Sequence, residues 1–330
     1  MKIYAQAGLL LATLLGIIIA AWAIGEVGLR QTFDAMRGIG WVGMALFTAT
    51  SLGVLTILGL AWHAVAPGER WSRVGSFIWA RTTREAATDV LPFSQLGGLV
   101  VGARTLTAAG VPEPVVYASM VADTTTEMAA QLLFTLAGVA TLWFVLTGDA
   151  GRLDVLPLAL AGVGGMVAII IAFVVAQRPL LTFAAKLGAR ILPGSAAAMV
   201  AVREQLDTIY RNPRRMIAAF LFNLLAWIAS AATAWVALHF MGNHAPLWAV
   251  MAQEALIFTL RSVAFAIPGA IGVQEATYAL LGPLFGIPPA TALALSLLKR
   301  ARDLLIGIPA LLLWQGAEAR ALARRLRGAS

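Results

Sequence analysis

The residues of this chain that could do chemistry are charged side chains placed inside long apolar stretches. Asp123, Glu127 and Gln131 recur every four residues between positions 112 and 146, a spacing that puts them on one face of a helix. Carboxylates in such a stripe can bind an ammonium group or carry a proton. A charge at the centre of a bilayer costs about 2.5–3.5 kcal/mol, so the stripe indicates ion pairing or contact with water.

Basic residues occupy the middle of a second apolar stretch, between positions 288 and 314. Lys299 and Asp303 are one turn apart and share a face, with Arg302 close to it, whereas Arg300 points elsewhere. Guanidinium groups bind phosphate through paired hydrogen bonds. Acid from one stretch and base from the other therefore predict a site for a zwitterionic or phosphate-linked headgroup.

Two further stretches, residues 77–110 and 247–286, are apolar but interrupted by glycine, proline and charge. We expect each to form a re-entrant helical hairpin, because non-helical backbone at membrane depth needs protein or a water-filled cavity around it. For the second stretch, a pair of short transmembrane helices is an alternative. The expected breaks are at Pro92, Gly97, Gly98, Pro268, Gly269 and Gly272.

Polar residues on these hairpins complete the predicted site. The full set expected to bind the headgroup is Arg84, Gln95, Arg104, Asp123, Glu127, Glu254, Arg261, Glu275, Lys299, Arg300, Arg302 and Asp303. The chain has no cysteine, and its three histidines lie far apart in the sequence. We therefore expect no catalytic residue, no metal ion and no cofactor.

The elements that hold these residues must be membrane helices. Of the 330 residues, 60% are hydrophobic and 12% are charged, which is more apolar surface than a soluble domain of this length can bury. Spans of about 20 apolar residues are expected at residues 4–24, 41–63, 112–146, 155–176, 216–240 and 288–314. The predicted fold is an all-α polytopic membrane protein with about six full transmembrane helices and two hairpins, in one domain over residues 1–330.

The positive charge, +8 overall, gathers in a few loops. Residues 178–215, the segment after the second span and the tail are rich in arginine, which places them and both termini in the cytoplasm of a bacterial inner membrane. Anionic lipids of the inner leaflet are the expected partners of these loops, and nucleic acid is not. Apolar residues at helical spacing, from Met199 to Ile209, predict an amphipathic helix that lies on the inner surface.

The two halves of the chain match at a single spacing. The matched pairs are Pro92 with Pro268, Pro112 with Pro288, Asp123 with Lys299, and Glu127 with Asp303, while Arg84 and Arg261 fall within one residue of this offset. The loop charges send the helix after each hairpin in opposite directions. We therefore predict an inverted repeat, with halves at residues 77–147 and 247–316, which is typical of transporters that bind substrate near the midplane.

These motifs resemble the transmembrane region of lysylphosphatidylglycerol synthases, a flippase-like membrane domain family. The runs that carry the resemblance are Leu91 to Gly98, Gly102 to Arg104, Glu254 to Leu256, Arg261 to Phe265, Gly272 to Glu275 and Leu298 to Asp303, with Asp123 and Glu127. The chain looks most similar to HpnL-type, hopanoid-associated proteins. The resemblance implies a flippase-like fold and, in the synthases, translocation of an aminoacylated phospholipid. No soluble aminoacyl-transferase domain follows the last span, so lysyl transfer is not expected.

The leading hypothesis is a lipid translocase linked to hopanoid or aminoacyl-phospholipid metabolism. One alternative is a lipid-modifying membrane enzyme such as a polyprenyl-phosphate phosphatase. However, Pro268-Gly269 is followed by Ala270-Ile271-Gly272-Val273, without the serine and arginine that such chemistry needs. Another alternative is a non-catalytic partner of lipid-biosynthesis enzymes, which would have no need of charged stripes within its spans.

Overall fold

The computed structural model describes residues 29–90, 94–148, 195–263 and 270–327, with a few isolated helical positions between 164 and 175. The expected spans at 4–24 and 155–176 therefore lie outside the described residues, apart from those positions. Within the described part every regular element is helical. This confirms the all-α class that the sequence predicts.

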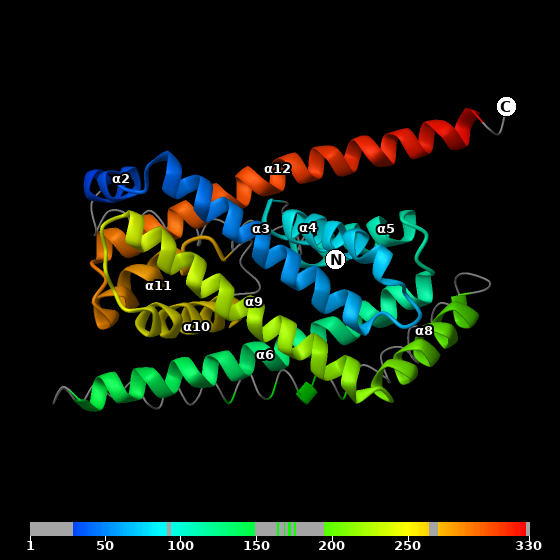
Figure 1. Cartoon of the computed structure of the whole chain (residues 1–330), viewed down its shortest axis with the longest axis horizontal. Helices are drawn as coiled ribbons and strands as arrows, with labels where there is room; N and C mark the ends of the chain where they lie inside the picture. Colours follow the sequence, from blue (N-terminus) through cyan, green and yellow to red (C-terminus); the bar gives the residue numbers. More distant parts are fainter. Residues whose placement is uncertain are drawn as a thin grey trace, which may run out of the picture.

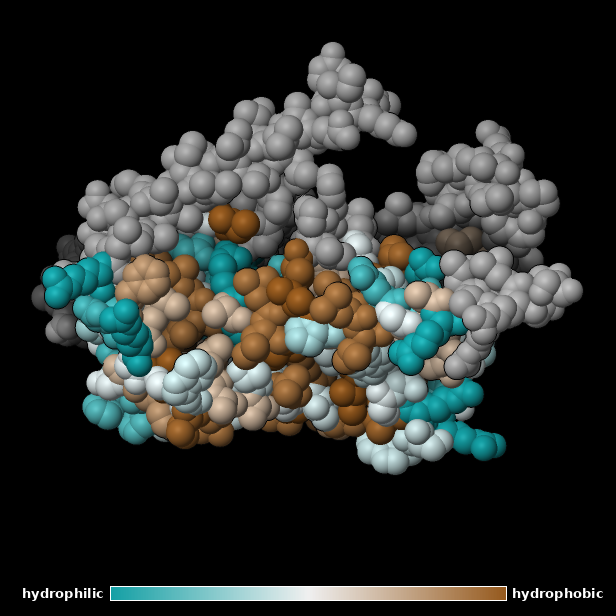
Figure 2. All heavy atoms as spheres, turned by 90° about the horizontal axis from the view of Figure 1, so that it is seen from above, coloured by the Kyte–Doolittle hydropathy of each residue, from teal (hydrophilic) through white to brown (hydrophobic). Residues whose placement is uncertain are grey.

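Three helices are long and apolar enough to cross a membrane: α3 (Gly40–Val65), α6 (Glu113–Gly148) and α9 (Pro213–Phe240). Each lies where the sequence predicts a full span. Their apolar side chains are largely exposed on the protein, as lipid-facing residues must be. Trp41 is 92% exposed and Val42 is 74% exposed at the start of α3. In Figure 2 apolar side chains cover the middle of the visible face, and polar side chains lie mainly at its two ends.

The last helix, α12 (Pro289–Arg327), has 39 residues, including Pro309. At 1.5 Å per residue it extends about 58 Å, well beyond a hydrocarbon core of about 30 Å. The basic tail after Gly316, for which the sequence predicts a short amphipathic helix, is instead the end of α12. The helix continues without a break through Gly316. Arg320 Nε donates a hydrogen bond to the carbonyl oxygen of Gly316 at 3.0 Å.

The two predicted hairpins appear as pairs of helices. The first is α4 (Val74–Val90) and α5 (Ser94–Ala108), and the second is α10 (Leu247–Val263) and α11 (Val273–Leu281), which the short helix η3 (Gly282–Phe285) follows. Pro92, Pro268 and Gly269 lie outside the described residues. Gly272 has a φ of +82° and precedes the first residue of α11, so the chain turns there.

Gly97 and Gly98 are not a break, contrary to the sequence prediction. Both lie inside α5. A Cβ atom on Gly98 would be 2.1 Å from Thr88 Oγ1 and 2.7 Å from the carbonyl oxygen of Arg84. Gly98 therefore allows α5 to pack closely on α4, and small residues at helix contacts in membranes have this role.

The helices occur in the same order twice. In Figure 1, α3 and α9 cross the centre side by side in opposite directions, while α6 and α12 run along opposite edges, also in opposite directions. α4 and α10 are both 17 residues long. Each half therefore consists of a long helix, a hairpin and a second long helix.

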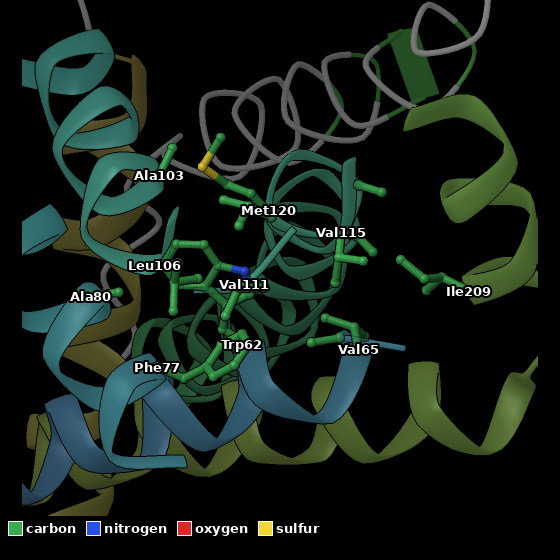
Figure 3. Close-up of a cluster of buried hydrophobic side chains, with 14 of the residues drawn as sticks. Trp62, Val65, Phe77, Ala80, Ala103, Leu106, Val111, Val115, Met120 and Ile209 are labelled. Atoms are coloured by element: carbon green, nitrogen blue, oxygen red, sulfur yellow. The ribbon is translucent and has the colours of Figure 1, made fainter. Parts of the chain in front are cut away.

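A buried apolar cluster joins α3, α4, α5 and α6 to α8 (Ser195–Tyr210) (Figure 3). Val202, Leu206 and Ile209 of α8 are buried in this cluster with Trp62 and Phe77. We expected this face of α8 to lie on the inner membrane surface. Instead it packs on the protein, because α6 offers an apolar face on which the same side chains are removed from water.

Candidate functional site

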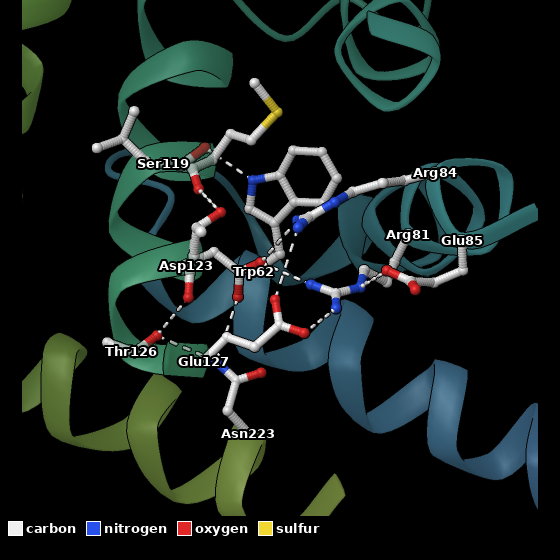
Figure 4. Close-up of polar contacts among 12 residues, drawn as sticks. Trp62, Arg81, Arg84, Glu85, Ser119, Asp123, Thr126, Glu127 and Asn223 are labelled. Atoms are coloured by element: carbon white, nitrogen blue, oxygen red, sulfur yellow. Dashed lines mark hydrogen bonds and ion pairs between the residues drawn. The ribbon is translucent and has the colours of Figure 1, made fainter. Parts of the chain in front are cut away.

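The first group of charges lies between α4 and α6 (Figure 4). Arg81 is 1% exposed and faces three carboxylates: Nη1 is 2.9 Å from Asp123 Oδ2, Nη2 is 2.5 Å from Glu127 Oε1, and Nε is 2.9 Å from Glu85 Oε1. Arg84, one turn along α4, reaches Asp123 at 3.4 Å and Glu127 at 3.6 Å. We call these five residues the Arg81 cluster. Its contacts bind the hairpin to the long helix by charge-assisted hydrogen bonds.

The helix α9 covers the Arg81 cluster from the other side. Asn223 is fully buried, and its Nδ2 atom donates to Thr126 Oγ1 at 3.0 Å and to Asp123 Oδ1 at 3.4 Å. One turn before Asp123, Ser119 Oγ accepts from Trp62 Nε1 at 3.1 Å. The polar face of α6 is therefore held by contacts from α3, α4 and α9.

A second charged group lies where α10, α11 and α12 meet. Glu254 accepts hydrogen bonds from the hydroxyl of Tyr278 and from Lys299 Nζ, and Lys299 Nζ also donates to the Tyr278 hydroxyl at 2.8 Å. All three side chains are buried, and we call them the Lys299 cluster. Lys299 Nζ lies 4.9 Å from the ring centre of Phe258, so a cation–π contact adds to the ion pair.

Glu275 connects the break of the second hairpin to α12. Its Oε2 atom accepts from the backbone N–H of Gly272 at 2.7 Å, and its Oε1 atom lies 2.5 Å from Arg300 Nε. The same carboxylate therefore caps the start of α11, where backbone N–H groups have no helical partner, and pairs with a cation on the long helix. Arg300 is 27% exposed.

A third set of charges lies between α4 and α12 and is only partly buried. Arg302 Nη2 is 2.5 Å from Asp303 Oδ1, and Arg302 Nη1 donates to Ser51 Oγ on α3 at 3.3 Å. Asp89, in the last turn of α4, is exposed and interacts electrostatically with Arg261, Arg302 and Asp303. We call these four charged residues the central group. Arg302 and Asp303 are 16% and 20% exposed, so neither charge is fully enclosed by the protein.

The Arg81 and Lys299 clusters occupy equivalent places in the two halves. Arg81 is the eighth residue of α4 and Glu254 is the eighth residue of α10. Asp123 is the eleventh residue of α6 and Lys299 is the eleventh residue of α12. Each half thus has one buried ion pair between its hairpin and its second long helix, with the two charges exchanged. By position in the helices, Arg81 corresponds to Glu254. The sequence offset instead matches Arg84, one turn after Arg81, with Arg261, two turns after Glu254.

Most of the residues predicted for the site lie in one of these groups. Arg104 does not, because it is 62% exposed and contacts Glu318 on the outer part of α12 at 3.4 Å. Gln131 lies further along α6 and donates to the carbonyl of Phe258 at 3.4 Å. The side chain of Gln95 lies outside the described residues. Among the described residues, no three His, Asp or Glu side chains are placed so that they could together hold a metal ion.

Sequence reasoning missed three buried polar residues: Arg81, Asn223 and Tyr278. We counted Arg81 as a basic residue of a cytoplasmic segment, although it precedes Glu85 by four residues and therefore shares a helical face with an acid. Asn223 is a lone amide within an apolar span, and such a residue indicates a polar contact inside the protein. Tyr278 gave no signal in the sequence, because tyrosine is common in membrane helices.

The family comparison covers most of the chain. Residues 7–310 match the family model described as the lysylphosphatidylglycerol synthase TM region. No curated protein and no solved structure gives a significant match. The matched range includes the Arg81 cluster, the Lys299 cluster and the central group. The chain is an integral, multi-pass membrane protein that belongs to the lysylphosphatidylglycerol synthase TM region family.

Proposed function

We propose that this protein translocates a lipid with a polar headgroup, which passes through the central group. The observation that carries this proposal is the exposure of Asp89 and the partial exposure of Arg302 and Asp303 between α4 and α12. An ion pair that only holds helices together would be expected to be sealed, as Lys299 and Glu254 are at 5% and 0% exposure. A water-accessible set of charges at membrane depth is typical of a substrate path.

The central group has the chemistry to hold a headgroup with charges of both signs. Arg302 is fixed by Asp303, Ser51 and the ring of Phe47, which lies 5.3 Å from its guanidinium carbon. The planar donors of a fixed guanidinium suit a phosphate, and the exposed carboxylate of Asp89 suits an ammonium. Zwitterionic and aminoacylated phospholipids fit this pattern, and the HpnL-type resemblance adds hopanoid-linked lipids to the classes to be tested.

The repeated order of the helices supports translocation rather than binding alone. We propose that the two halves are an inverted repeat in the membrane and that the hairpins are re-entrant. Transporters built in this way open their site to each side in turn, by rocking one half against the other around a site near the midplane. The central group suits such a site, because it joins α4 of one half to α12 of the other.

Lipid co-purification tests the site. The wild type, Arg302→Gln and Asp89→Asn are purified in mild detergent, and their bound lipids are identified by mass spectrometry. Arg104→Gln is the control, because it neutralises an arginine outside all three groups. We expect one class of polar lipid to be enriched in the wild type and the control and lost from both central variants. Equal bulk lipids in all four preparations would overturn the headgroup site.

A transport assay tests the activity itself. The four proteins are reconstituted into vesicles that contain the enriched lipid with a fluorescent label, and its movement between leaflets is followed by quenching from outside. We expect movement with the wild type and Arg104→Gln, and at least a tenfold loss with Arg302→Gln, about 1.4 kcal/mol in the barrier. Rates equal to those of protein-free vesicles for all four proteins would show that the lipid is bound without being moved.

A further inference from the structure

The Arg81 cluster contains more negative than positive charge. Its two cations, Arg81 and Arg84, face three carboxylates, those of Glu85, Asp123 and Glu127. The most accessible of the five side chains, Glu85, is 28% exposed, and Asp123 is fully buried. An uncompensated charge is strongly disfavoured in such surroundings. The described groups therefore leave a deficit of one positive charge.

The same place contains an acceptor without a donor. The Oδ1 atom of Asn223 is buried and has no hydrogen-bond partner among the described residues, although the Nδ2 atom of the same amide contacts Asp123 and Thr126. Turning the amide over would point its oxygen at the carboxylate of Asp123, so the observed orientation is the favourable one. In Figure 4 the free oxygen points away from Asp123, to the side where Glu127 lies.

The equivalent place in the other half has no surplus charge. In the Lys299 cluster one carboxylate faces one ammonium, and the Tyr278 hydroxyl both donates to Glu254 and accepts from Lys299. The neighbouring carboxylate, Glu275, is balanced by Arg300. The surplus charge therefore belongs to the first half alone, whereas a buried amide oxygen without a partner also occurs in the second half, at Gln253.

We infer that the Arg81 cluster binds one small cation, H⁺ or Na⁺, held between the carboxylates of Asp123 and Glu127 and the amide oxygen of Asn223. A bound cation cancels the surplus charge and gives that oxygen a partner. Asp123 and Asn223 have no exposed surface, so the ligand must be small enough to enter without its water, which excludes the ammonium group of a lipid. The site would couple lipid movement to an ion gradient, yet its existence does not depend on the proposed substrate.

The charged and polar groups around this site come from four helices. α4 provides Arg81, Arg84 and Glu85, and α6 provides Asp123 and Glu127 beside Thr126. α9 provides the uncharged amide of Asn223, and α3 provides Trp62, whose N–H is used by Ser119. Glu127→Gln removes the surplus charge while keeping an acceptor for Arg81. It should therefore abolish cation binding and leave the fold intact.

Thermal unfolding in detergent tests the inference without any lipid substrate. The wild type, Glu127→Gln and the control Glu318→Gln, which changes a carboxylate far from the cluster, are unfolded at constant ionic strength with Na⁺ replaced by K⁺ or choline. If Na⁺ is the ligand, the midpoint of the wild type and the control rises with the logarithm of the Na⁺ concentration, and that of Glu127→Gln does not.

If the ligand is a proton, Na⁺ has no specific effect and the pH dependence carries the signal. A proton bound only by the folded state is lost as the pH rises, so wild-type stability falls relative to Glu127→Gln between about pH 5 and about pH 8. Glu85→Gln removes the same surplus charge from the accessible edge and replaces Glu127→Gln if that variant does not fold. The inference would be overturned if the unfolding midpoints of the wild type and both variants changed in the same way with Na⁺ concentration and with pH.

Discussion

Removal of the amine of Lys299 is expected to destabilise the protein severely. Lys299→Met keeps most of the side-chain volume but leaves the carboxylate of Glu254 without its cation. Because Glu254 is fully buried, water cannot replace the lost partner, and breaking one member of a buried pair costs about 3–5 kcal/mol. The hydroxyl of Tyr278 still donates to Glu254, which puts the expected loss at the lower end, about 3 kcal/mol.

Exchange of the two charges should recover most of this loss. The variant with Glu254→Lys and Lys299→Glu places a cation on the hairpin and a carboxylate on the long helix, the arrangement that Arg81 and Asp123 already have in the other half. The hydroxyl of Tyr278 can accept from one residue and donate to the other. The contact of Lys299 with the ring of Phe258 is lost, at a cost of about 0.5–2 kcal/mol, so recovery is incomplete.

The free energy of unfolding is measured by denaturant titration in mixed micelles for the wild type, Lys299→Met, Glu254→Lys, Lys299→Glu and the exchange variant. A loss below about 1 kcal/mol for Lys299→Met is the behaviour of a solvent-exposed ion pair and would refute the reasoning from burial. If the exchange variant loses as much free energy of unfolding as the two single substitutions lose in sum, the equivalence of the two halves is refuted.

Three further changes test the packing around the charged groups. Gly98→Ala should destabilise the protein by about 1–3 kcal/mol, because its Cβ meets Thr88, whereas Gly97→Ala, with open space around its Cβ, should be neutral in the same unfolding titration. Gly272→Ala should cost about 1–3 kcal/mol, because alanine rarely adopts the φ of +82° seen there, and the stability of the variant checks this. Arg215→Gln should cost about 1 kcal/mol in thermal unfolding, because it removes the 2.8 Å hydrogen bond to the carbonyl of Ala66 after α3.

The helices that the sequence places well are those with an uninterrupted apolar pattern. α3, α6 and α9 begin within three residues of the predicted spans at Trp41, Pro112 and Met216. The apolar pattern is misleading where a residue is required by its contact with a neighbouring helix. The pair Gly97 and Gly98 was interpreted as a break, although a glycine inside a helix equally indicates close packing, and the sequence does not show which neighbour approaches.

The site was predicted in part, for a similar reason. A four-residue spacing identifies residues on one helix face, so Asp123 and Glu127 were found together. It does not show what faces them. Arg81 lies within the predicted hairpin 77–110, but arginine there favours the cytoplasmic side and it is absent from the predicted site. The three carboxylates around it offset the cost of burying it. Tyr278 and Asn223 act through contacts with residues distant in the sequence.

In the first half the cation lies on the hairpin and the carboxylate on the long helix, and in the second half the two are exchanged. This opposite arrangement gives a physical reason for buried charges at positions where apolar residues would be about as stable. The halves have hairpins and long helices of similar length, so a hairpin could dock on the wrong long helix. In that arrangement Arg81 would meet Lys299, and Glu254 would meet Asp123, with like charges buried against each other. Had both halves the same polarity, the wrong docking would form good pairs. The opposite signs therefore penalise incorrect assembly and favour the native pairing of each hairpin with its own long helix.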